Sequence, residues 1–251
     1  MKFQLKPILK EIKALYSKPI SNERFEEYIS KLQGDTKGDL KLPISGFNPM
    51  AKTHIIKKIE ELEAVNADLI MKHVINEFNS NLKESNKATI EVVLNLADDL
   101  KGAWTNFYST DFDSKFKLNA FVKRNFCVPY FWTSEVYTEK LIQQRTIEYL
   151  NRTLFWLNNP KPKTLEDHLE QEIFVYKNAR DDYAKSDASK FESIETYYLL
   201  NKQSEDYNLI FNFFYGDAAS ENLGYRKYGF DDTTGFEYAK LNANKKKLNN
   251  Q

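Results

Sequence analysis

The middle third of the chain brings together the residue types from which binding pockets are built. Aromatic, basic, amide and acidic side chains mix there more densely than in most other stretches. The residues that we expect to bind a ligand are Trp104, Asn106, Asp111, Arg124, Trp132, Glu135, Arg145 and Glu148. Pockets typically combine aromatic walls with a few convergent polar groups. We therefore predict that this stretch lines a polar and aromatic cleft.

Three charged residues stand in a row on the helix predicted over residues 134–158. Arg145, Glu148 and Arg152 follow one another at steps of three and four. Guanidinium groups bind carboxylate or phosphate through two parallel hydrogen bonds, so a row enclosed in a crevice would recognise a small anionic ligand. The other interpretation is an ion-pair row that fixes the helix register, since Glu148 precedes Arg152 by four residues. We favour the ion-pair row.

Glu172 is the carboxylate that stands out from its surroundings. It falls inside an apolar stripe formed by Leu165, Leu169 and Ile173. A carboxylate in such a place must find a partner or give up its charge. A salt bridge or hydrogen bond to a neighbouring helix is the favoured interpretation, and a general acid or base in a cleft is the alternative.

The three histidines raise the question of a metal site. His73 with Glu77 and His168 with Glu172 each stand four apart on a predicted helix, a spacing that lets both side chains reach one ion. The carboxylate-bridged helical bundles use Glu-x-x-His, three apart, and neither pair matches that spacing. His54 falls opposite the stripe of isoleucines around it and is predicted to be a solvated surface residue.

Motifs that would name a reaction are absent from the sequence. There is no glycine-rich phosphate loop, no G-x-S-x-G, no H-E-x-x-H, no C-x-x-C and no EF-hand spacing. The residues match no catalytic family motif, and no cofactor is expected.

Charge and cysteine content limit the partners and the compartment. The 36 basic and 36 acidic side chains leave a formal net charge of zero, which disfavours nucleic acid as a partner. The one cysteine, Cys127, lies in an apolar run and is predicted to be a small buried residue in a reducing compartment. The amphipathic start of the chain lacks the pattern of a signal peptide, and no run reaches the roughly 18 apolar residues of a membrane span. We therefore expect a soluble cytoplasmic protein, and the abundance of Lys, Asn and Ile is typical of AT-rich bacterial genomes.

Two Trp-Thr pairs, Trp104-Thr105 and Trp132-Thr133, fall where a new element is expected to begin. An indole at such a junction covers the edge of the core while its N–H finds a polar partner. The threonines and Ser134 can bond back to the backbone, and Thr133 or Ser134 is the predicted cap of the long helix.

Helical spacing dominates the elements that must position these residues. Apolar residues recur at steps of three and four over residues 5–16, 21–34, 48–65, 66–82, 134–158, 164–178, 191–199 and 207–216. The run over residues 88–100 fits a helix, yet its β-branched start also suits a strand. Residues 125–132 are short, aromatic and bounded by turn-like residues, so they favour a strand in which Pro129 needs an edge position. The last residues, 241–251, are expected to be disordered.

The predicted fold is mainly α, a single domain over residues 1–240 with about eight helices around the long helix 134–158, and a short β element between residues 88 and 132. The leading functional hypothesis is a binding or protein-interaction module, capable of homo-oligomerisation. Catalytic motifs are missing, Tyr and Phe that are expected to be exposed recur from 191 to 238, and interfaces are rich in aromatics. The alternative is an enzyme that uses Glu135, Glu148 or Glu172 with Arg124 and Arg145 on an anionic substrate. A metal-binding helical bundle is the third.

Overall fold

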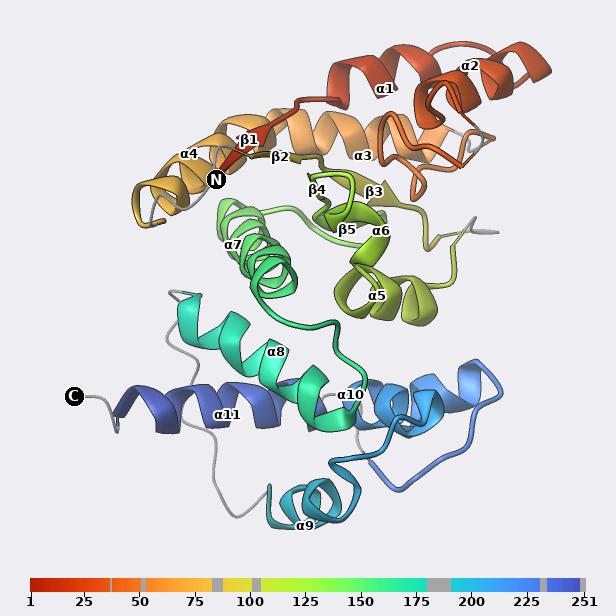
Figure 1. Ribbon diagram of the computed structural model, residues 1–251. Helices are drawn as coiled ribbons and strands as arrows, with labels where there is room; N and C mark the ends of the chain where they lie inside the picture. The colour runs from red at the N-terminus through yellow and green to blue at the C-terminus, as the bar shows by residue number, and fades with distance from the viewer. Residues whose placement is uncertain are drawn as a thin grey trace. The chain divides into compact units, whose positions relative to one another are not determined.

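The protein is mainly α-helical with a small β element, as the sequence predicts (Figure 1). The computed structural model describes residues 1–36, 38–50, 53–82, 88–100, 105–179, 191–230 and 234–248. The chain divides into two compact units, Met1–Leu150 (unit 1) and Asn151–Gln251 (unit 2). This division falls inside the helix that was expected at the centre of one domain over residues 1–240.

Unit 1 holds the strands and the first six helices. The helices are α1 (Leu9–Tyr16), α2 (Asn22–Leu32), α3 (Thr53–Ala64), α4 (Ala67–Ser80), α5 (Phe107–Phe116) and α6 (Asn119–Val122), and α7 (Glu139–Asn158) begins here. In α3 the buried face carries Ile55, Ile59 and Leu62, as the spacing predicts. The helix α4 instead buries Ala67, Met71 and Ile75, and the stripe of Ile70, Val74 and Phe78 that was expected to face inward is only half-buried. Ser21 caps α2 by accepting a hydrogen bond from the backbone of Arg24.

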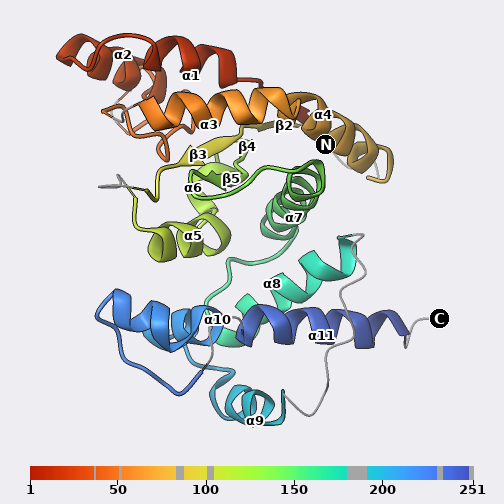
Figure 2. The ribbon, with the colours of Figure 1, turned by 180° about the vertical axis from the view of Figure 1, so that it is seen from behind.

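All the described strands of unit 1 pair in parallel. They are β1 (Lys2–Leu5), β2 (Thr89–Val92), β3 (Asn95–Ala97), β4 (Phe126–Cys127) and β5 (Tyr130–Trp132), with β1-β2-β4 in one sheet and β3-β5 in a second. In both views the strands lie between α3 and α4 on one side and α5 and α7 on the other (Figures 1 and 2). The β element predicted between residues 88 and 132 is therefore confirmed.

The run 88–100 forms strands, so its helix interpretation is wrong. Every residue from Val92 to Asp98 is buried. Strands of a parallel sheet are covered on both faces and read as continuous apolar runs without alternation, which is why the period of this segment was ambiguous. The strand β1 was missed for a different reason. The helix predicted from Leu5 begins only at Leu9, because Pro7 holds the preceding residue in extended conformation.

Pro129 separates β4 from β5 without changing their pairing. Val92 is paired with Cys127 and Asn95 with Tyr130, so one register continues across the proline. Because β4 lies at the edge of its sheet, the missing N–H of Pro129 is tolerated. The parallel pairing brings the carboxyl ends of β3 and β5 to the same edge. We call residues 98–99 and 133–135, which follow these two strands, the carboxyl edge.

The long helix α7 starts later than the sequence predicts. It begins at Glu139, and the hydroxyl of Thr138 accepts a hydrogen bond from the backbone N–H of Leu141 at 3.1 Å. Thr133 and Ser134 do not cap it, because their hydroxyls bind acidic side chains of the carboxyl edge instead. Val136, which was expected on an apolar face of this helix, lies outside it and is 80% exposed.

Unit 2 holds the end of α7 and four further helices. These are α8 (Leu165–Asn178), α9 (Glu192–Asn201), α10 (Tyr207–Asn222) and α11 (Thr234–Leu248), and α11 packs against α8 and α10. Thr164 and Asp167 form the predicted capping box of α8. The expected break at Gly216 is a kink inside α10, where the glycine has φ 79°. The helix α11 continues to Leu248, into the segment 241–251 that was expected to be disordered.

The aromatic residues of the C-terminal region mostly fill the core of unit 2. Phe211, Phe213 and Phe214 are fully buried, and Phe191, Tyr215 and Tyr238 are nearly so. Many of these rings pack edge-to-face, as in the contact of Tyr197 with Phe230 at 4.4 Å. The expectation that the aromatics of residues 191–238 form an exposed surface is therefore wrong. In the described parts of the chain, no helix has the length and apolar character needed to cross a membrane.

Candidate functional site

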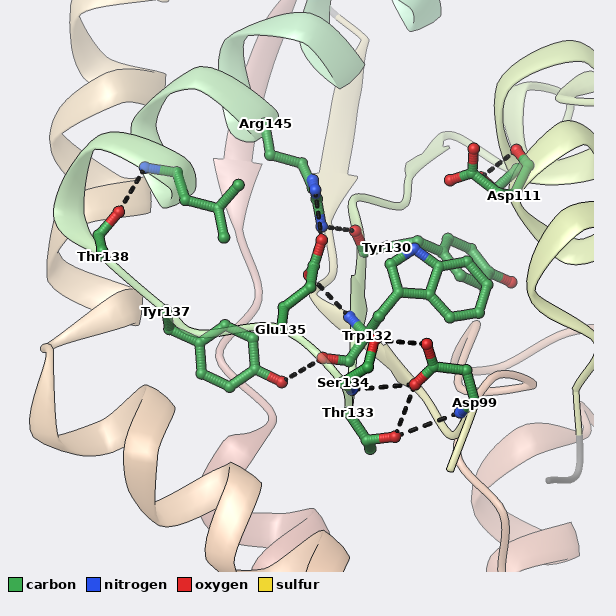
Figure 3. Close-up of polar contacts among 12 residues, drawn as sticks. Asp99, Asp111, Tyr130, Trp132, Thr133, Ser134, Glu135, Tyr137, Thr138 and Arg145 are labelled. Carbon is green, nitrogen blue, oxygen red and sulfur yellow. Dashed lines mark hydrogen bonds and ion pairs between the residues drawn. The ribbon is translucent and has the colours of Figure 1, made fainter. Parts of the chain in front are cut away.

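Three of the predicted binding residues meet in one cluster beside the carboxyl edge (Figure 3). Arg145 of α7 donates two hydrogen bonds to Glu135, each of 2.6 Å, and one to the carbonyl of Tyr130 at 3.1 Å. Glu135 also accepts the backbone N–H of Trp132 at 3.0 Å, and the buried indole packs on Phe107 with ring centroids 4.7 Å apart. This cluster fixes residues 130–135 against α7.

The charge of Arg145 is balanced within this cluster. Burial acts to lower its pKa, but the hydrogen bonds and the charge of Glu135 outweigh burial and raise the pKa above its ordinary value. The carboxylate of Asp111, on α5, acts in the same direction from a greater distance. Asp111 itself is buried and paired with Lys115 one turn along α5. The guanidinium of Arg145 is thus committed to carboxylates of the protein.

The other predicted binding residues lie apart from this cluster or serve a helix. Asn106 is the N-cap of α5 and accepts the backbone N–H of Ser109 at 3.1 Å. Glu148 accepts a hydrogen bond from Gln144 along α7 at 3.1 Å. Arg124 precedes β4, at the opposite end of the strands from Glu135, and donates to the carbonyl of Gly38. Trp104 lies outside the described residues.

The carboxyl edge carries a second network, built around Asp98 and Asp99; Figure 3 shows the contacts of Asp99 with Thr133 and Ser134. The hydroxyl of Thr133 lies 3.0 Å from Oδ1 of Asp98 and 2.9 Å from Oδ1 of Asp99. Asp99 also accepts hydrogen bonds from the backbone N–H and the hydroxyl of Ser134, at 2.9 and 2.6 Å. The parallel pairing of β3 with β5 places these groups together although 35 residues separate Thr133 from Asp98.

His54 joins this network and is not the solvated surface residue that the sequence predicts. Its Nε2 lies 2.9 Å from Oδ2 of Asp98, and the two side chains are 27% and 2% exposed. His54 stands in the first turn of α3, so the helix brings the imidazole to the carboxyl edge. The periodicity of α3 shows only that His54 lies opposite the core of that helix; it cannot show that another part of the chain covers this face.

A pocket of about 320 Å³ opens beside the same strands. Hydroxyl groups dominate its wall, together with one ion pair and the aromatic rings of Phe121 and Tyr130. The lining residues are Ser45, Gly46, Thr105, Thr110, Asp113, Ser114, Lys117, Ala120, Phe121 and Tyr130. Tyr130 connects the pocket to the Arg145 cluster through its carbonyl, and Thr105 connects it to the carboxyl edge by donating to the carbonyl of Asp98 at 2.8 Å.

A buried amide stands behind this wall. Asn95 is fully buried, and neither its Oδ1 nor its Nδ2 makes a hydrogen bond of normal geometry within the described chain, although the amide lies close enough to the Tyr130 hydroxyl to act on its pKa. A Cβ atom added at Gly46 would lie 2.9 Å from Oδ1 of Asn95, so only glycine fits there without displacing the amide. Burial raises the pKa of the Tyr130 hydroxyl, and the neighbouring Ser45 and Asn95 act against that rise. The phenol stays protonated and can donate.

The remaining candidate residues stabilise unit 2. Arg152 donates to Glu172 from Nε at 2.8 Å and from Nη2 at 2.6 Å, and both side chains are fully buried. This confirms the favoured interpretation of Glu172. His168 binds the carbonyl of Thr164 through Nδ1, at 2.7 Å. Among the described residues no group of three or more His, Cys, Asp or Glu side chains could hold a metal ion.

In comparisons with known proteins, no family model, no curated protein and no solved structure matches the chain.

Sequence reasoning missed His54, Asn95, Asp98, Asp99 and the hydroxyls of the pocket. The acidic pair directly after an apolar run was the available signal, because ligands bind outside the carboxyl ends of parallel strands. That signal could be used only if the run had been assigned to a parallel strand.

Proposed function

We propose that unit 1 is a binding module for a small, neutral, polar molecule, held in the pocket beside β3 and β5. The observation that carries this proposal is the pairing of a hydroxyl-lined pocket with the buried amide of Asn95, which makes no hydrogen bond of normal geometry within the described chain. Two of the four buried side-chain atoms without a partner in the described chain belong to this one residue. Leaving a buried polar group unpaired costs about 1–3 kcal/mol, so such a group is expected to have a purpose or a transient partner.

A neutral ligand fits the pocket better than the anionic one suggested by the arginines. Lys117 is the one basic residue in the described lining, and its ammonium lies 2.7 Å from the carboxylate of Asp113. The hydroxyls of Ser45, Thr110 and Tyr130 both donate and accept, which suits the hydroxyl and amide groups of an uncharged molecule. A volume of about 320 Å³ corresponds to the lower end of ligand pockets.

The alternative, an enzyme acting on an anionic substrate through glutamate and arginine, has less support. Glu135 is bound by Arg145, and Glu172 by Arg152. Glu148 accepts a hydrogen bond from Gln144. Charged groups that are already paired and partly desolvated are poor proton carriers unless a substrate displaces the partner.

The test is calorimetric titration of the protein with four uncharged probes: ribose, myo-inositol, nicotinamide and adenosine. We expect saturable binding of at least one probe, and a loss of affinity of about tenfold in Tyr130→Phe, since one hydrogen bond is removed without a change of shape. The matched control is Ser80→Ala, which removes an exposed hydroxyl that donates to the carbonyl of Glu77 within α4. Absence of saturable binding by all four probes, or equal affinity in Tyr130→Phe and Ser80→Ala, would overturn the proposal.

A further inference from the structure

His54 and Asp98 form a proton-carrying pair at the carboxyl edge that the proposed ligand pocket does not use. The imidazole Nε2 and the carboxylate Oδ2 lie 2.9 Å apart. A carboxylate only accepts hydrogen bonds, so Nε2 must carry the proton of the neutral ring and Nδ1 keeps its lone pair. Within the described chain the imidazole makes no second hydrogen bond, and the His54 side chain is 27% exposed.

Asp98 is held firmly enough to orient the ring. Its Oδ1 lies 3.0 Å from the hydroxyl of Thr133 and accepts the backbone N–H of Leu100 at 3.2 Å, while Thr105 binds its carbonyl. These contacts leave Oδ2 for His54. A base that is oriented by a fixed third group is the arrangement found in nucleophilic and hydrolytic sites.

The helix that carries His54 is tied to the same edge. Lys58, one turn further along the same face of α3, donates to the carbonyl of Glu135 at 3.0 Å. Two residues of one helix face therefore reach the two segments that follow β3 and β5. The carboxyl ends of parallel strands are where open α/β sheets bind their ligands.

We propose that His54 is a catalytic general base and that Asp98 is its positioning residue, in the hydrolysis of a neutral carboxylic ester. Nδ1 takes a proton from water while the water oxygen forms a bond to the carbonyl carbon. The carbon–oxygen bond to the alcohol group then breaks, and the departing oxygen takes the proton back from Nδ1. The products are a carboxylic acid and an alcohol, and no oxidant or further reactant is consumed.

The carboxylates near His54 favour a neutral substrate over an anionic one. Asp99 shares the hydroxyl of Thr133 with Asp98, so the edge carries two carboxylates, and that of Asp98 contacts the imidazole. An anionic substrate, such as a phosphate ester, would be repelled there. A neutral ester avoids this repulsion.

In the competing interpretation, His54 only shields the buried carboxylate of Asp98 from solvent. The kinetics of hydrolysis distinguish this interpretation from the catalytic one. The probe is p-nitrophenyl acetate, with full-length protein. In His54→Gln the amide can still donate to Asp98 but cannot take a proton, so we expect the rate of hydrolysis to fall at least tenfold, within the range of general-base effects. His73→Gln is the matched control, because His73 is exposed on α4, and it should keep the wild-type rate. A rate in His54→Gln equal to that in His73→Gln overturns the proposal.

Nuclear magnetic resonance measures which ring nitrogen of His54 carries the proton, a property that a merely structural role of His54 does not require. With only three histidines, the ring nitrogens can be assigned by substitution. We expect His54 to carry its proton on Nε2 in the wild type and to lose that preference in Asp98→Asn, with a fall in hydrolysis that parallels His54→Gln. If Asp98→Asn does not fold, the His54→Gln kinetics and the wild-type tautomer still decide, and a wild-type proton on Nδ1 overturns the proposal.

Discussion

Thr133 is the residue on which the carboxyl edge depends. Its hydroxyl has one proton, yet it lies within 3.0 Å of two carboxylates, and its oxygen accepts the backbone N–H of Asp99 at 3.2 Å. Thr133 and Asp98 are almost completely buried. Water therefore cannot replace this hydroxyl easily, and the two acidic groups rely on it for their separation.

We expect Thr133→Val to destabilise the protein by about 1–3 kcal/mol, because the shape is kept while buried acceptors lose their donor. Urea denaturation measures the change. The control is Thr146→Val: Thr146 is equally buried, but its hydroxyl donates only to the carbonyl of Ile142 within α7, so the loss should be smaller. An equal loss in the two variants would show that the edge has no special dependence on Thr133.

His168 gives unit 2 a dependence on pH. Burial lowers the pKa of its imidazole, although the hydrogen bond to Thr164 and the charges of Asp167 and Glu172 act in the other direction. The unfolded chain has the ordinary value of about 6.5, so below that pH the unfolded state takes up a proton that the folded state refuses. The free energy of unfolding must then fall as the pH drops through this range.

We predict that the melting temperature falls more between about pH 7.5 and pH 5.5 in the wild type than in His168→Gln, which cannot titrate. Scanning calorimetry at the two pH values measures the difference. His54 and His73 are present in both proteins and cancel in the comparison. Equal falls in the two proteins would mean that His168 is protonated as readily in the folded state as in the unfolded one.

Individual helices follow rules that act over a few residues. The capping box of α8 is an example: Thr164 accepts the backbone N–H of Asp167 at 3.1 Å, and the carboxylate of Asp167 accepts the backbone N–H of Thr164 at 2.9 Å. Such pairs satisfy amides that have no partner within the helix, so they can be read from residue type and spacing alone.

Thr164→Ala should therefore cost about 1 kcal/mol of stability. Urea denaturation again provides the measurement. Thr196→Ala is the control, since the hydroxyl of Thr196 only bonds back to the carbonyl of Glu192 inside α9, and alanine is the better helix former. The cap would be shown to be unimportant if both variants kept the stability of the wild type.

The pairing of the strands depends on residues that are far apart in the sequence. The two neighbours of β2 in its sheet are β1, from the first residues of the chain, and β4, from the segment after α6. Burial on both faces then removes the alternation from which a strand is normally recognised. The strands β4 and β5 were anticipated from their aromatic residues and flanking turns, whereas β1 was missed because Leu5, its last residue, was assigned to the helix that begins only after Pro7.

At the scale of the whole molecule, each of the two compact units has its own cluster of polar side chains. The pocket, His54 and the carboxyl edge all belong to unit 1, while the buried pair of Arg152 and Glu172 belongs to unit 2. Gln171 extends that pair by donating to Glu172 and by accepting the indole N–H of Trp156 at 2.7 Å. Removing one member should leave a charge buried without a partner.

We predict that Arg152→Met destabilises unit 2 by about 3–5 kcal/mol. Amide hydrogen exchange of the full-length protein should show lost protection in unit 2, with changes in unit 1 within about 0.5 kcal/mol, as expected for independent regions. The double variant Arg152→Met with Glu172→Leu is the control, because removing both charges should restore most of the stability. Equal loss of protection in both units would instead favour the single domain that the sequence predicts.

The sequence by itself determined the features that depend on neighbours within one or two helical turns. The mainly helical class, the caps at Ser21 and Thr164 and the buried state of Cys127 all follow from residue type and spacing. The buried partner of Glu172 was also anticipated, because a charge on an apolar stripe must be neutralised wherever the chain provides an opposite charge.

Only the tertiary structure decided which side chains meet. Parallel pairing requires long connections, so Asp98 and Thr133 come together across the whole of α5 and α6, and His54 reaches them from another helix. The candidate ligand residues therefore differ from those chosen by local density. Arg145 and Glu135 bind each other, whereas the buried amide of Asn95 makes no hydrogen bond within the described chain. Which polar group is already satisfied is a property of the folded chain, because it depends on contacts between residues far apart in the sequence.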